Sequence, residues 1–300
     1  MRIFFKLAVL CCLALVSGTS VSTNRNGFTA DVDTISQQGI AVETIDSIIY
    51  APGCTDKATS GYACGNDSIS TIEGAHEPKD SINDTKSASG FEPYPGFVLI
   101  RDYVPDVIEE IRYFTTNNFM GERADGYEAN VAIASKQAAI QLKEVADELR
   151  PMGYVIKIFD AYRPQSAVDH FVRWSKTGDQ RNKADYYPNL AKSSLFPTYI
   201  ARKSGHSKGS TFDMTICYKD TGIEVDMGSH FDYFGQASHT MFLGKYSGGT
   251  VTKEHQKNRL LLRRVMEKHG FSPYDNEWWH FTLKNQPYPK TYFNFPVTDH

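Results

Sequence analysis

The pattern of apolar and polar positions divides the chain into an N-terminal part without a core-forming pattern and a C-terminal part with one. Residues 21–90 are rich in Ser, Thr, Asp, Asn and Gly. Such a composition buries too little apolar surface to offset the entropy lost on ordering, so we expect a linker or a loosely ordered extension. Aromatic and aliphatic residues become dense from residue 91 onward. We therefore expect one folded domain over 91–300, of about 200 residues.

Within this domain, hydrophobic periodicity predicts three helices and three strands. The expected helices are 133–150, 164–174 and 252–269. The expected strands are 154–159, 211–216 and 277–283. Because helices and strands follow one another irregularly, we expect an α+β fold in which a mixed or antiparallel sheet packs with helices.

Residues 1–20 have the features of an export signal. A basic start with Arg2 and Lys6 precedes an apolar run over 7–16, and small residues follow at 17–20. The run is about half of the ~20 residues that a membrane-spanning helix needs, so we expect the signal to be removed and no stable membrane insertion to remain. A buried N-terminal strand is the alternative. The signal predicts a periplasmic or secreted protein.

Charge and cysteine content narrow the possible partners. The formal net charge is -3 and is spread along the chain, so we expect no binding to nucleic acid. In an exported protein, Cys54 and Cys64 are candidates for a short-loop disulfide, which would leave Cys217 unpaired. We interpret Cys217 as a buried core thiol, and a cysteine nucleophile is the alternative. The sequence makes no prediction about the oligomeric state.

Two short segments supply the residue types of a metallohydrolase. Residues 204–213 have the sequence SGHSKGSTFD, and residues 277–280 have the sequence EWWH. His206, Asp213 and His280 together offer two imidazoles and one carboxylate to a zinc ion, provided that the glycine-containing turn brings the first two together. Three protein ligands leave a fourth position open to water, as in catalytic zinc sites. We expect one Zn²⁺ per chain; the alternative is a core histidine and an unrelated aspartate.

Glu277, three residues before His280, is the candidate general base and acid. Residues three apart in a regular strand point to opposite faces, so the two groups serve one site only if this strand is bulged or twisted. A strand whose Glu277 and His280 face solvent is the alternative. Arg163 lies in the turn between an expected strand and an expected helix, where it could stabilise an oxyanion. A surface ion pair is the open alternative for this arginine.

These residues lie in stretches that resemble the VanX-type D-alanyl-D-alanine dipeptidases, which are zinc enzymes of the D-Ala-D-Ala metallopeptidase family with a hedgehog-like fold. The resemblance extends over about 91–297. The matching stretches are TTNNF at 115–119, DGYE at 125–128, DAYRP at 160–164, residues 206–213, MGSHFD at 227–232, SH at 238–239, EWWHF at 277–281 and PYP at 287–289. So many matches in the same order make the resemblance specific.

The resemblance implies zinc-dependent hydrolysis of D-alanyl-D-alanine or a similar small D,D-dipeptide, for example in cell-wall peptide turnover. The implied site residues are His206, Asp213 and His280 as zinc ligands, Glu277 as general base and acid, Arg163 on the transition state, Asp232 on the substrate ammonium, and Tyr127 and Ser204 in the pocket lining. From the bare sequence, a solvated loop acid is the alternative for Asp232. Two rival functions stay open: a peptidoglycan D,D- or L,D-carboxypeptidase, and a non-catalytic zinc-containing binding module.

Two positions depart from the family pattern. The family commonly has Ala where this chain has Thr211, and the VanX enzyme has Ser where this chain has Gly205. We interpret the first departure as a packing change, whereas the second, next to a zinc ligand, bears on substrate contacts. The family's resistance enzyme works in the cytoplasm, but this chain is expected to be exported. The resemblance therefore predicts the chemistry and not the physiological role.

Overall fold

The computed structural model of the protein describes residues 92–300. The expected signal at 1–20, the expected linker at 21–90 and the expected Cys54–Cys64 pairing lie outside these residues. None of the helices in the described part of the chain is both long enough and apolar enough to cross a bilayer.

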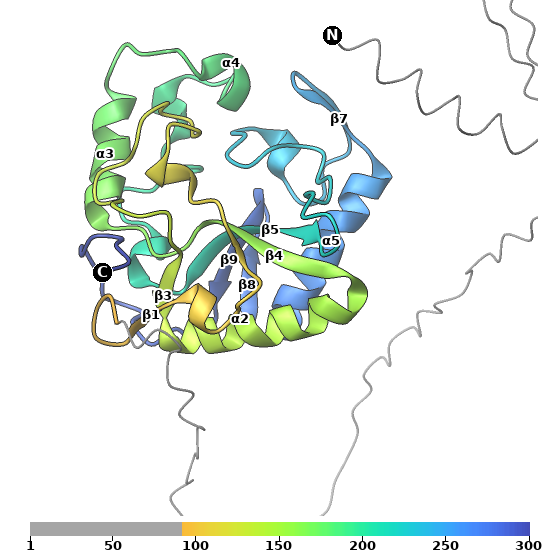
Figure 1. The fold of residues 1–300 in the computed structure, drawn as a ribbon. Helices are drawn as coiled ribbons and strands as arrows, with labels where there is room; N and C mark the ends of the chain where they lie inside the picture. Colours follow the sequence, from red (N-terminus) through yellow and green to blue (C-terminus); the bar gives the residue numbers. More distant parts are fainter. Residues whose placement is uncertain (1–91) are drawn as a thin grey trace, which may run out of the picture. The chain divides into compact units, whose positions relative to one another are not determined.

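A five-stranded mixed sheet forms the centre of the fold (Figure 1). The strand order is β2-β4-β5-β9-β8, with β2 parallel to β4 and the other neighbours antiparallel. The strands are β2 (Ile108–Glu109), β4 (Tyr154–Asp160), β5 (Thr211–Tyr218), β9 (Glu277–Leu283) and β8 (Phe271–Tyr274). The three strands expected from the sequence are the three in the middle of the sheet. The predicted α+β fold with a mixed sheet is confirmed.

Two long helices, α2 (Lys136–Leu149) and α5 (Lys253–Lys268), pack against the sheet and against each other. In α2, Ala138, Leu142, Val145 and Leu149 are fully buried, and their spacing of three and four residues forms one apolar stripe. The other helices, α3 (Gln165–Ser175) and α4 (Lys183–Tyr186), lie away from α2 and α5, at the upper left of Figure 1.

Neighbouring structure and caps decide where the helices begin. The helix expected at 133–150 begins three residues later, because Ile133–Ser135 forms the strand β3 and the side chain of its last residue accepts a hydrogen bond from the backbone of Ala138. The expected start was therefore wrong. Pro164 is the N-cap of α3, and Thr252 caps α5 in a capping box. These two helices match the sequence prediction within one residue at each end.

Short elements complete the fold. They are β1 (Phe97–Leu99), β6 (Gly244–Tyr246) and β7 (Gly249–Val251), and the 3-10 turns η2 (Ile100–Asp102), η3 (Arg112–Phe114), η4 (Arg150–Met152), η5 (Lys192–Leu195), η6 (Gly205–Lys208) and η7 (Gln236–Ser238). β1 pairs with β3, and β6 pairs with β7, each antiparallel. Segments this short have no readable periodicity, which is why the sequence did not predict them.

Both faces of β5 are buried. Alternation along the strand places Phe212 and Met214 on one face and Asp213 on the other. Cys217, near the end of β5, is a free thiol that is 0% exposed, and burial raises its pKa to about 11. A thiol with such a pKa is not a thiolate nucleophile at neutral pH. The interpretation of Cys217 as a core thiol is confirmed.

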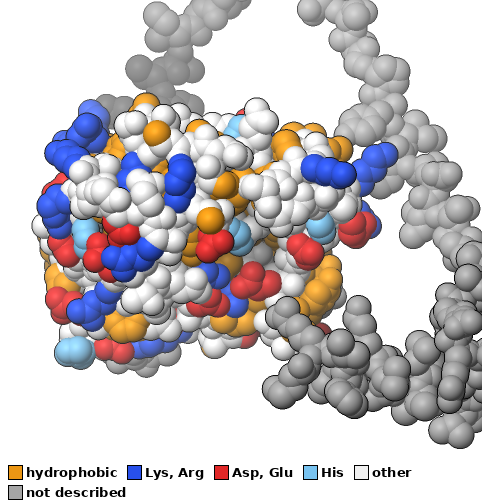
Figure 2. All heavy atoms as spheres, turned by 90° about the horizontal axis from the view of Figure 1, so that it is seen from above, with side chains coloured by type: hydrophobic (Ala, Val, Ile, Leu, Met, Phe, Trp, Pro, Cys, Tyr) orange, Lys and Arg blue, Asp and Glu red, His pale blue; other side chains and the backbone are white. Residues whose placement is uncertain are grey.

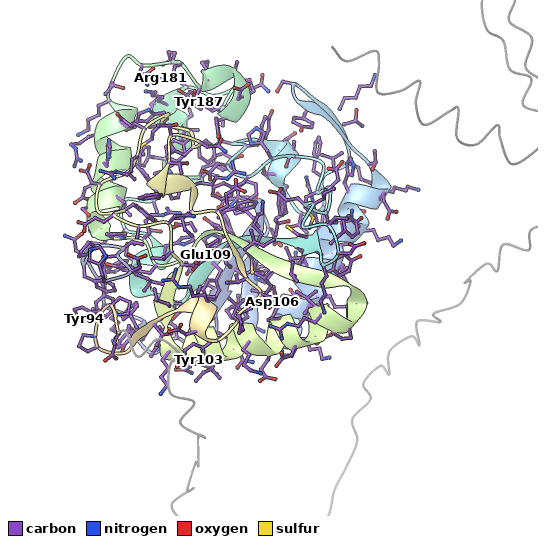
Figure 3. All side chains as sticks on the ribbon, in the orientation of Figure 1. Tyr94, Tyr103, Asp106, Glu109, Arg181 and Tyr187 are labelled. Atoms are coloured by element: carbon purple, nitrogen blue, oxygen red, sulfur yellow. The ribbon has the colours of Figure 1, made fainter. Side chains whose placement is uncertain are left out.

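The face seen in Figure 2 carries acidic and basic side chains side by side. Several charges in the described part of the chain are paired: Arg150 lies 2.7 Å from Asp106, which is labelled in Figure 3, and Lys157 lies 2.7 Å from Glu110. Partly exposed pairs of this kind contribute roughly 0–1 kcal/mol each. The stability of the domain therefore rests mainly on its buried core.

Candidate active site

Three side chains from separate elements converge beside the β5–β9 pair. The register of these strands places Asp213 opposite His280, and Asp213 Oδ1 lies 3.0 Å from His280 Nδ1. His206 comes from η6, just before β5, and its Nε2 lies 3.3 Å from Asp213 Oδ2 and 3.3 Å from His280 Nδ1. One donor atom from each residue lies within 4.8 Å of the other two. The structure thus brings together the three ligands expected from the sequence.

A glycine turn leads from η6 into β5. Gly209 has a φ of +79°, and a Cβ at this position would lie 2.1 Å from the ring of Phe97. Only glycine fits both the left-handed backbone and the close approach. Ser204 caps the start of η6 by accepting a hydrogen bond from the backbone N–H of His206 at 3.2 Å. The turn expected between His206 and Asp213 is confirmed.

The arrangement of the donor atoms fits a zinc ion. His206 Nδ1 donates to the backbone oxygen of Ala161 at 2.8 Å, so the lone pair of Nε2 points toward the other two ligands. This lone pair faces Asp213 Oδ2, a second acceptor, at 3.3 Å, an arrangement that a shared cation stabilises. Ligand atoms about 2.0–2.2 Å from a tetrahedral ion lie roughly 3.3–3.6 Å apart. The two separations from His206 Nε2, 3.3 Å to Asp213 Oδ2 and 3.3 Å to His280 Nδ1, lie at the lower end of this range, and three ligands leave one position open.

The protonation states of the ligands also suit a metal. Burial would raise the pKa of Asp213, but the adjacent His206 and His280 side chains hold it below its usual range. Burial lowers the pKa of His280, which favours the neutral imidazole. Metal ligands must be deprotonated to bind. Both groups are therefore held in the form that binds a cation.

Arg163 lies in the same site, between two acids. Its Nε donates to Asp160 Oδ2 at 2.8 Å, and its Nη2 donates to Asp213 Oδ2 at 3.3 Å. The guanidinium also lies 4.8 Å from the ring centre of Tyr113. Burial would lower the pKa of Arg163, but Tyr113, Asp160 and the other surrounding groups raise it well above its usual range. The residue is a fixed positive charge in the wall of the site.

The strand β9 is irregular at the catalytic candidates. Pro273 pairs with Phe281, whereas the next residue of β8, Tyr274, pairs with Glu277, so the register shifts across the intervening part of β9. As a result Glu277 Oε2 lies 3.7 Å from His280 Nδ1, although the two residues are three apart in a strand. The predicted bulge or twist is confirmed.

The carboxyl group of Glu277 is buried in the cavity wall, with 8% of the residue exposed. Burial raises its pKa well above the usual range, and the negative charges of Asp213 and Asp232 act in the same direction. A raised pKa makes the carboxylate a stronger base, as a group that accepts a proton and returns it requires. Glu277 thus has the environment of a general acid and base.

Asp232 is a buried acid and not a solvated loop residue. It is 4% exposed, lines the cavity and accepts a hydrogen bond from the hydroxyl of Tyr113 at 2.8 Å. Its φ of 61° lies in the left-handed region, which aspartate tolerates better than most residues. Burial, reinforced by the negative charge of Asp213, raises its pKa to about 8. A buried acid of this kind is suited to a positively charged partner.

A cavity of about 220 Å³ joins these groups. Its polar lining includes Arg163, Ser204, His206, Asp213, Asp232, Glu277 and His280. Phe119, Phe171 and Phe234 contribute apolar wall, and residues 197–201 cover one side. Tyr274 holds this covering segment by donating to the backbone oxygen of Thr198 at 3.0 Å. Pockets for drug-sized ligands measure about 300–1,000 Å³, so this cavity suits a smaller molecule.

Tyr127 is not among the residues that line the cavity. It is 2% exposed, and its hydroxyl donates to Asp160 Oδ1 at 2.6 Å. The structure therefore places Tyr127 behind the wall, in support of Asp160, rather than in the pocket lining that the resemblance implies. Ser204, in contrast, lines the cavity as expected.

Comparison with known proteins agrees with this geometry. A family model described as D-ala-D-ala dipeptidase matches residues 94–298. The chain belongs to the D-Ala-D-Ala dipeptidase family. The D-alanyl-D-alanine dipeptidase of Enterococcus faecalis is 40% identical over 205 residues, which cover 68% of this chain and 98% of that protein. The enzyme of the same name from Streptomyces coelicolor is 37% identical over 203 residues, or 67% of this chain and 98% of that protein.

Family membership confirms the predicted family and the predicted class of peptidase. A third relative, the D-alanyl-D-alanine dipeptidase of Enterococcus faecium, is 36% identical over 204 residues, or 67% of this chain and 98% of that protein. The matched region contains every element that contributes to the cavity.

The two departures from the family pattern are close in space. A Cβ on Gly205 would lie 3.2 Å from Thr211 Oγ1, and that hydroxyl lies within hydrogen-bonding distance of Thr282 Oγ1, at 3.0 Å. A larger side chain at position 205 would therefore crowd Thr211, and a smaller residue at position 211 would relieve the crowding. Gly205 also lines the cavity, so a substrate contact is the competing interpretation.

Sequence reasoning missed three parts of this site: Asp160, Tyr113 and the covering segment 197–201. Asp160 belongs to the DAYRP stretch that contains Arg163, so a signal for it was present. Tyr113 and residues 197–201 lie in segments without a motif or a periodic pattern. Their place in the cavity wall depends on the tertiary fold.

Proposed function

We propose that this protein is an exported zinc dipeptidase that hydrolyses D-alanyl-D-alanine or a similar D,D-dipeptide. The observation that carries the proposal is that one small cavity gathers a three-ligand metal site, the buried Glu277 and the buried Asp232. The names of the relatives, which are D-alanyl-D-alanine dipeptidases, support the substrate class.

In the proposed reaction, His206, Asp213 and His280 would hold the zinc ion. A zinc ion with an open position supplies bound water with a pKa near 7 and polarises a carbonyl group. Glu277 accepts a proton from the attacking water and returns it to the leaving amine. Arg163 donates hydrogen bonds to the carbonyl oxygen as negative charge develops there.

Asp232 would orient the dipeptide by pairing with its free ammonium group. A carboxypeptidase acts on a long stem peptide whose corresponding nitrogen is acylated, which would leave Asp232 buried and without a cationic partner. The small cavity and this buried acid therefore favour the dipeptidase over a D,D- or L,D-carboxypeptidase. Glu277 and Arg163 count against a non-catalytic binding module, because a structural zinc site needs neither residue.

The test is a substrate panel assayed with the purified protein, with and without a chelator. We expect one zinc ion per chain, rapid cleavage of D-alanyl-D-alanine, slow cleavage of L,D- and L,L-dipeptides and of N-acetylated dipeptides, and complete loss of activity on chelation. Cleavage of stem peptides and N-acetylated dipeptides at the rate of free dipeptides would replace the proposal with the carboxypeptidase. Zinc binding without turnover of any substrate would favour the binding module.

Export is the second part of the proposal and rests on residues 1–20. An exported dipeptidase would act on peptides released in cell-wall turnover. Sequencing the N-terminus of the protein isolated from cells tests this part independently of the enzyme assay. We expect the mature chain to begin close to residue 21, and an intact Met1 would refute export.

A further inference from the structure

Asp160 is a fully buried carboxylate at the end of β4, at the back of the active site, with an exposure of 0%. One of its oxygens, Oδ1, accepts a hydrogen bond from the hydroxyl of Tyr127 at 2.6 Å. The other oxygen, Oδ2, accepts from Arg163 Nε at 2.8 Å and lies 3.5 Å from His206 Nδ1. This one carboxylate therefore touches both the expected oxyanion residue and an expected metal ligand.

The strand pairing makes the position of Asp160 electrostatically costly. The register between β4 and β5 shifts after Ile158, and the shift places Asp160 opposite Asp213. Like charges directly opposite each other destabilise a sheet. Arg163 offsets this repulsion because it donates to both acids, from Nε to Asp160 and from Nη2 to Asp213. Packing of the sheet alone does not require two facing acids with an arginine between them.

The contacts of Asp160 also define the orientation of its neighbours. With Nε held by Asp160, the guanidinium of Arg163 lies over the ring of Tyr113, 4.8 Å from its centre, and Arg163 lines the cavity. The negative charge beside His206 Nδ1 supports the tautomer in which Nδ1 carries the proton and Nε2 is free for a metal. Outer groups of this kind orient metal ligands and raise their basicity.

We propose that Asp160 is a positioning residue that couples the metal site to the oxyanion site, and that Tyr127 locks it in place. The proposal rests on the proposed function for its catalytic part and on the fit of the three ligands for its metal part. It assigns Tyr127 to the support of Asp160 and removes it from direct contact with substrate. It also predicts that metal affinity and turnover change together when this carboxylate is altered.

The test compares Asp160→Asn and Tyr127→Phe with a matched control, Asp106→Asn. Asp106 also accepts two hydrogen bonds from one arginine, Arg150, each at 2.7 Å, but it does not line the cavity and lies beside α2 in Figure 3. Four quantities are measured on each full-length protein: the Kd for zinc by competition with a chromophoric chelator, kcat and KM for D-alanyl-D-alanine, and the melting temperature.

Asp160→Asn should weaken zinc binding by about 10- to 100-fold and lower kcat by a similar factor, with a smaller change in KM. Tyr127→Phe keeps the ring and removes one hydrogen bond, so the affinity for zinc and kcat should each fall by about threefold to tenfold. Asp106→Asn should lower the melting temperature while its zinc Kd and kcat stay within about twofold of the native values.

The proposal is overturned if Asp160→Asn binds zinc and turns over like the native protein while only its melting temperature falls. If Asp160→Asn does not fold, Tyr127→Phe decides, and native zinc affinity together with native kcat in that variant overturns the proposal. If the native protein cleaves no dipeptide, the proposed function fails. In that case the zinc Kd values of the variants still test whether Asp160 supports the metal site.

Discussion

The short distance between a side chain placed at position 205 and Thr211 Oγ1 allows the two departures from the family pattern to be tested as one unit. If they are a packing exchange, Gly205→Ser and Thr211→Ala should each destabilise the protein, and the double variant should be more stable than the sum of the two effects. If Gly205 instead serves a substrate contact, the two substitutions should act independently. A double-mutant cycle separates these cases.

The expected magnitudes follow from the local geometry. A Cβ at position 205 would lie 3.2 Å from Thr211 Oγ1, and the partner of that hydroxyl, Thr282 Oγ1 at 3.0 Å, limits how far it can retreat. Crowding of a packed site costs about 1–3 kcal/mol, and the reduced freedom of the unfolded chain returns about 0.4–1 kcal/mol. Gly205→Ser should therefore lower the free energy of unfolding by about 1 kcal/mol, within a range of ~0–2.6 kcal/mol.

Thr211→Ala should lower the free energy of unfolding by a similar ~1–2 kcal/mol, because it removes a buried methyl group and a hydroxyl hydrogen bond. In the double variant the serine occupies the space that Thr211 leaves. We expect the double variant to be about 1 kcal/mol more stable than additivity predicts. Gly205→Ala is the matched control, because it adds the same Cβ without a hydroxyl and should show the same coupling.

Urea unfolding of the native protein and the variants measures the coupling, and steady-state kinetics on D-alanyl-D-alanine measures KM. The packing explanation requires a coupling of about 1 kcal/mol and a KM of Gly205→Ser within about twofold of the native value. Additivity within ~0.3–0.5 kcal/mol, combined with a clear change in KM, would refute it and assign position 205 to the substrate.

Four further predictions concern the site and the domain boundary. Glu277→Gln should keep its zinc, measured by metal analysis, yet lose about 10²- to 10⁴-fold in kcat, and loss of the metal would contradict a role as general base. Asp232→Ala should discriminate less between free and N-acetylated dipeptides, and unchanged kcat/KM ratios would remove the ammonium pocket. Because burial raises the pKa of Asp232 from 3.8 to about 8, the folded metal-free protein holds a proton that the unfolded chain releases, so stability from this group is lost as pH rises. The melting temperature of the metal-free native protein minus that of Asp232→Asn should therefore decrease between pH 4 and pH 8, and a constant difference would contradict the raised pKa. A truncated chain that begins at Phe91 should fold and keep its kcat, and failure to fold would show that earlier residues belong to the core.

The parts of the site that the sequence predicted are those with local signals. The strand at 277–283 and the helix at 252–269 follow from periodicity and caps, and the structure reproduces both. The three metal ligands could be predicted because the segments 204–213 and 277–280 supply His and Asp side chains, which are common protein ligands of zinc. The irregular β9 could be predicted because a regular strand cannot direct Glu277 and His280 to one site.

The parts that the sequence did not predict depend on contacts between distant segments. The hydroxyl of Tyr113 donates a hydrogen bond to Asp232, which lies 119 residues away in the chain, and no local sequence pattern indicates this pairing. The register shift that places Asp160 opposite Asp213 arises where β4 meets β5. Tyr127 was expected in the pocket lining because the resemblance covers its stretch, but only the packed structure shows that its hydroxyl points to Asp160.

The charge balance of the cavity explains why a metal and an ammonium group belong together in this site. Four buried carboxylates, those of Asp160, Asp213, Asp232 and Glu277, surround a single guanidinium, that of Arg163. Burying uncompensated charge is costly, and the raised pKa values of Asp232 and Glu277 are the expected response of the protein alone. A divalent cation would neutralise two of the three excess negative charges, and a substrate ammonium would give the buried Asp232 a cationic partner. A free dipeptide also carries a carboxylate and is neutral overall, so it differs from an N-acylated peptide at this site by the ammonium that pairs with Asp232. This pairing is the physical basis for expecting a dipeptidase here.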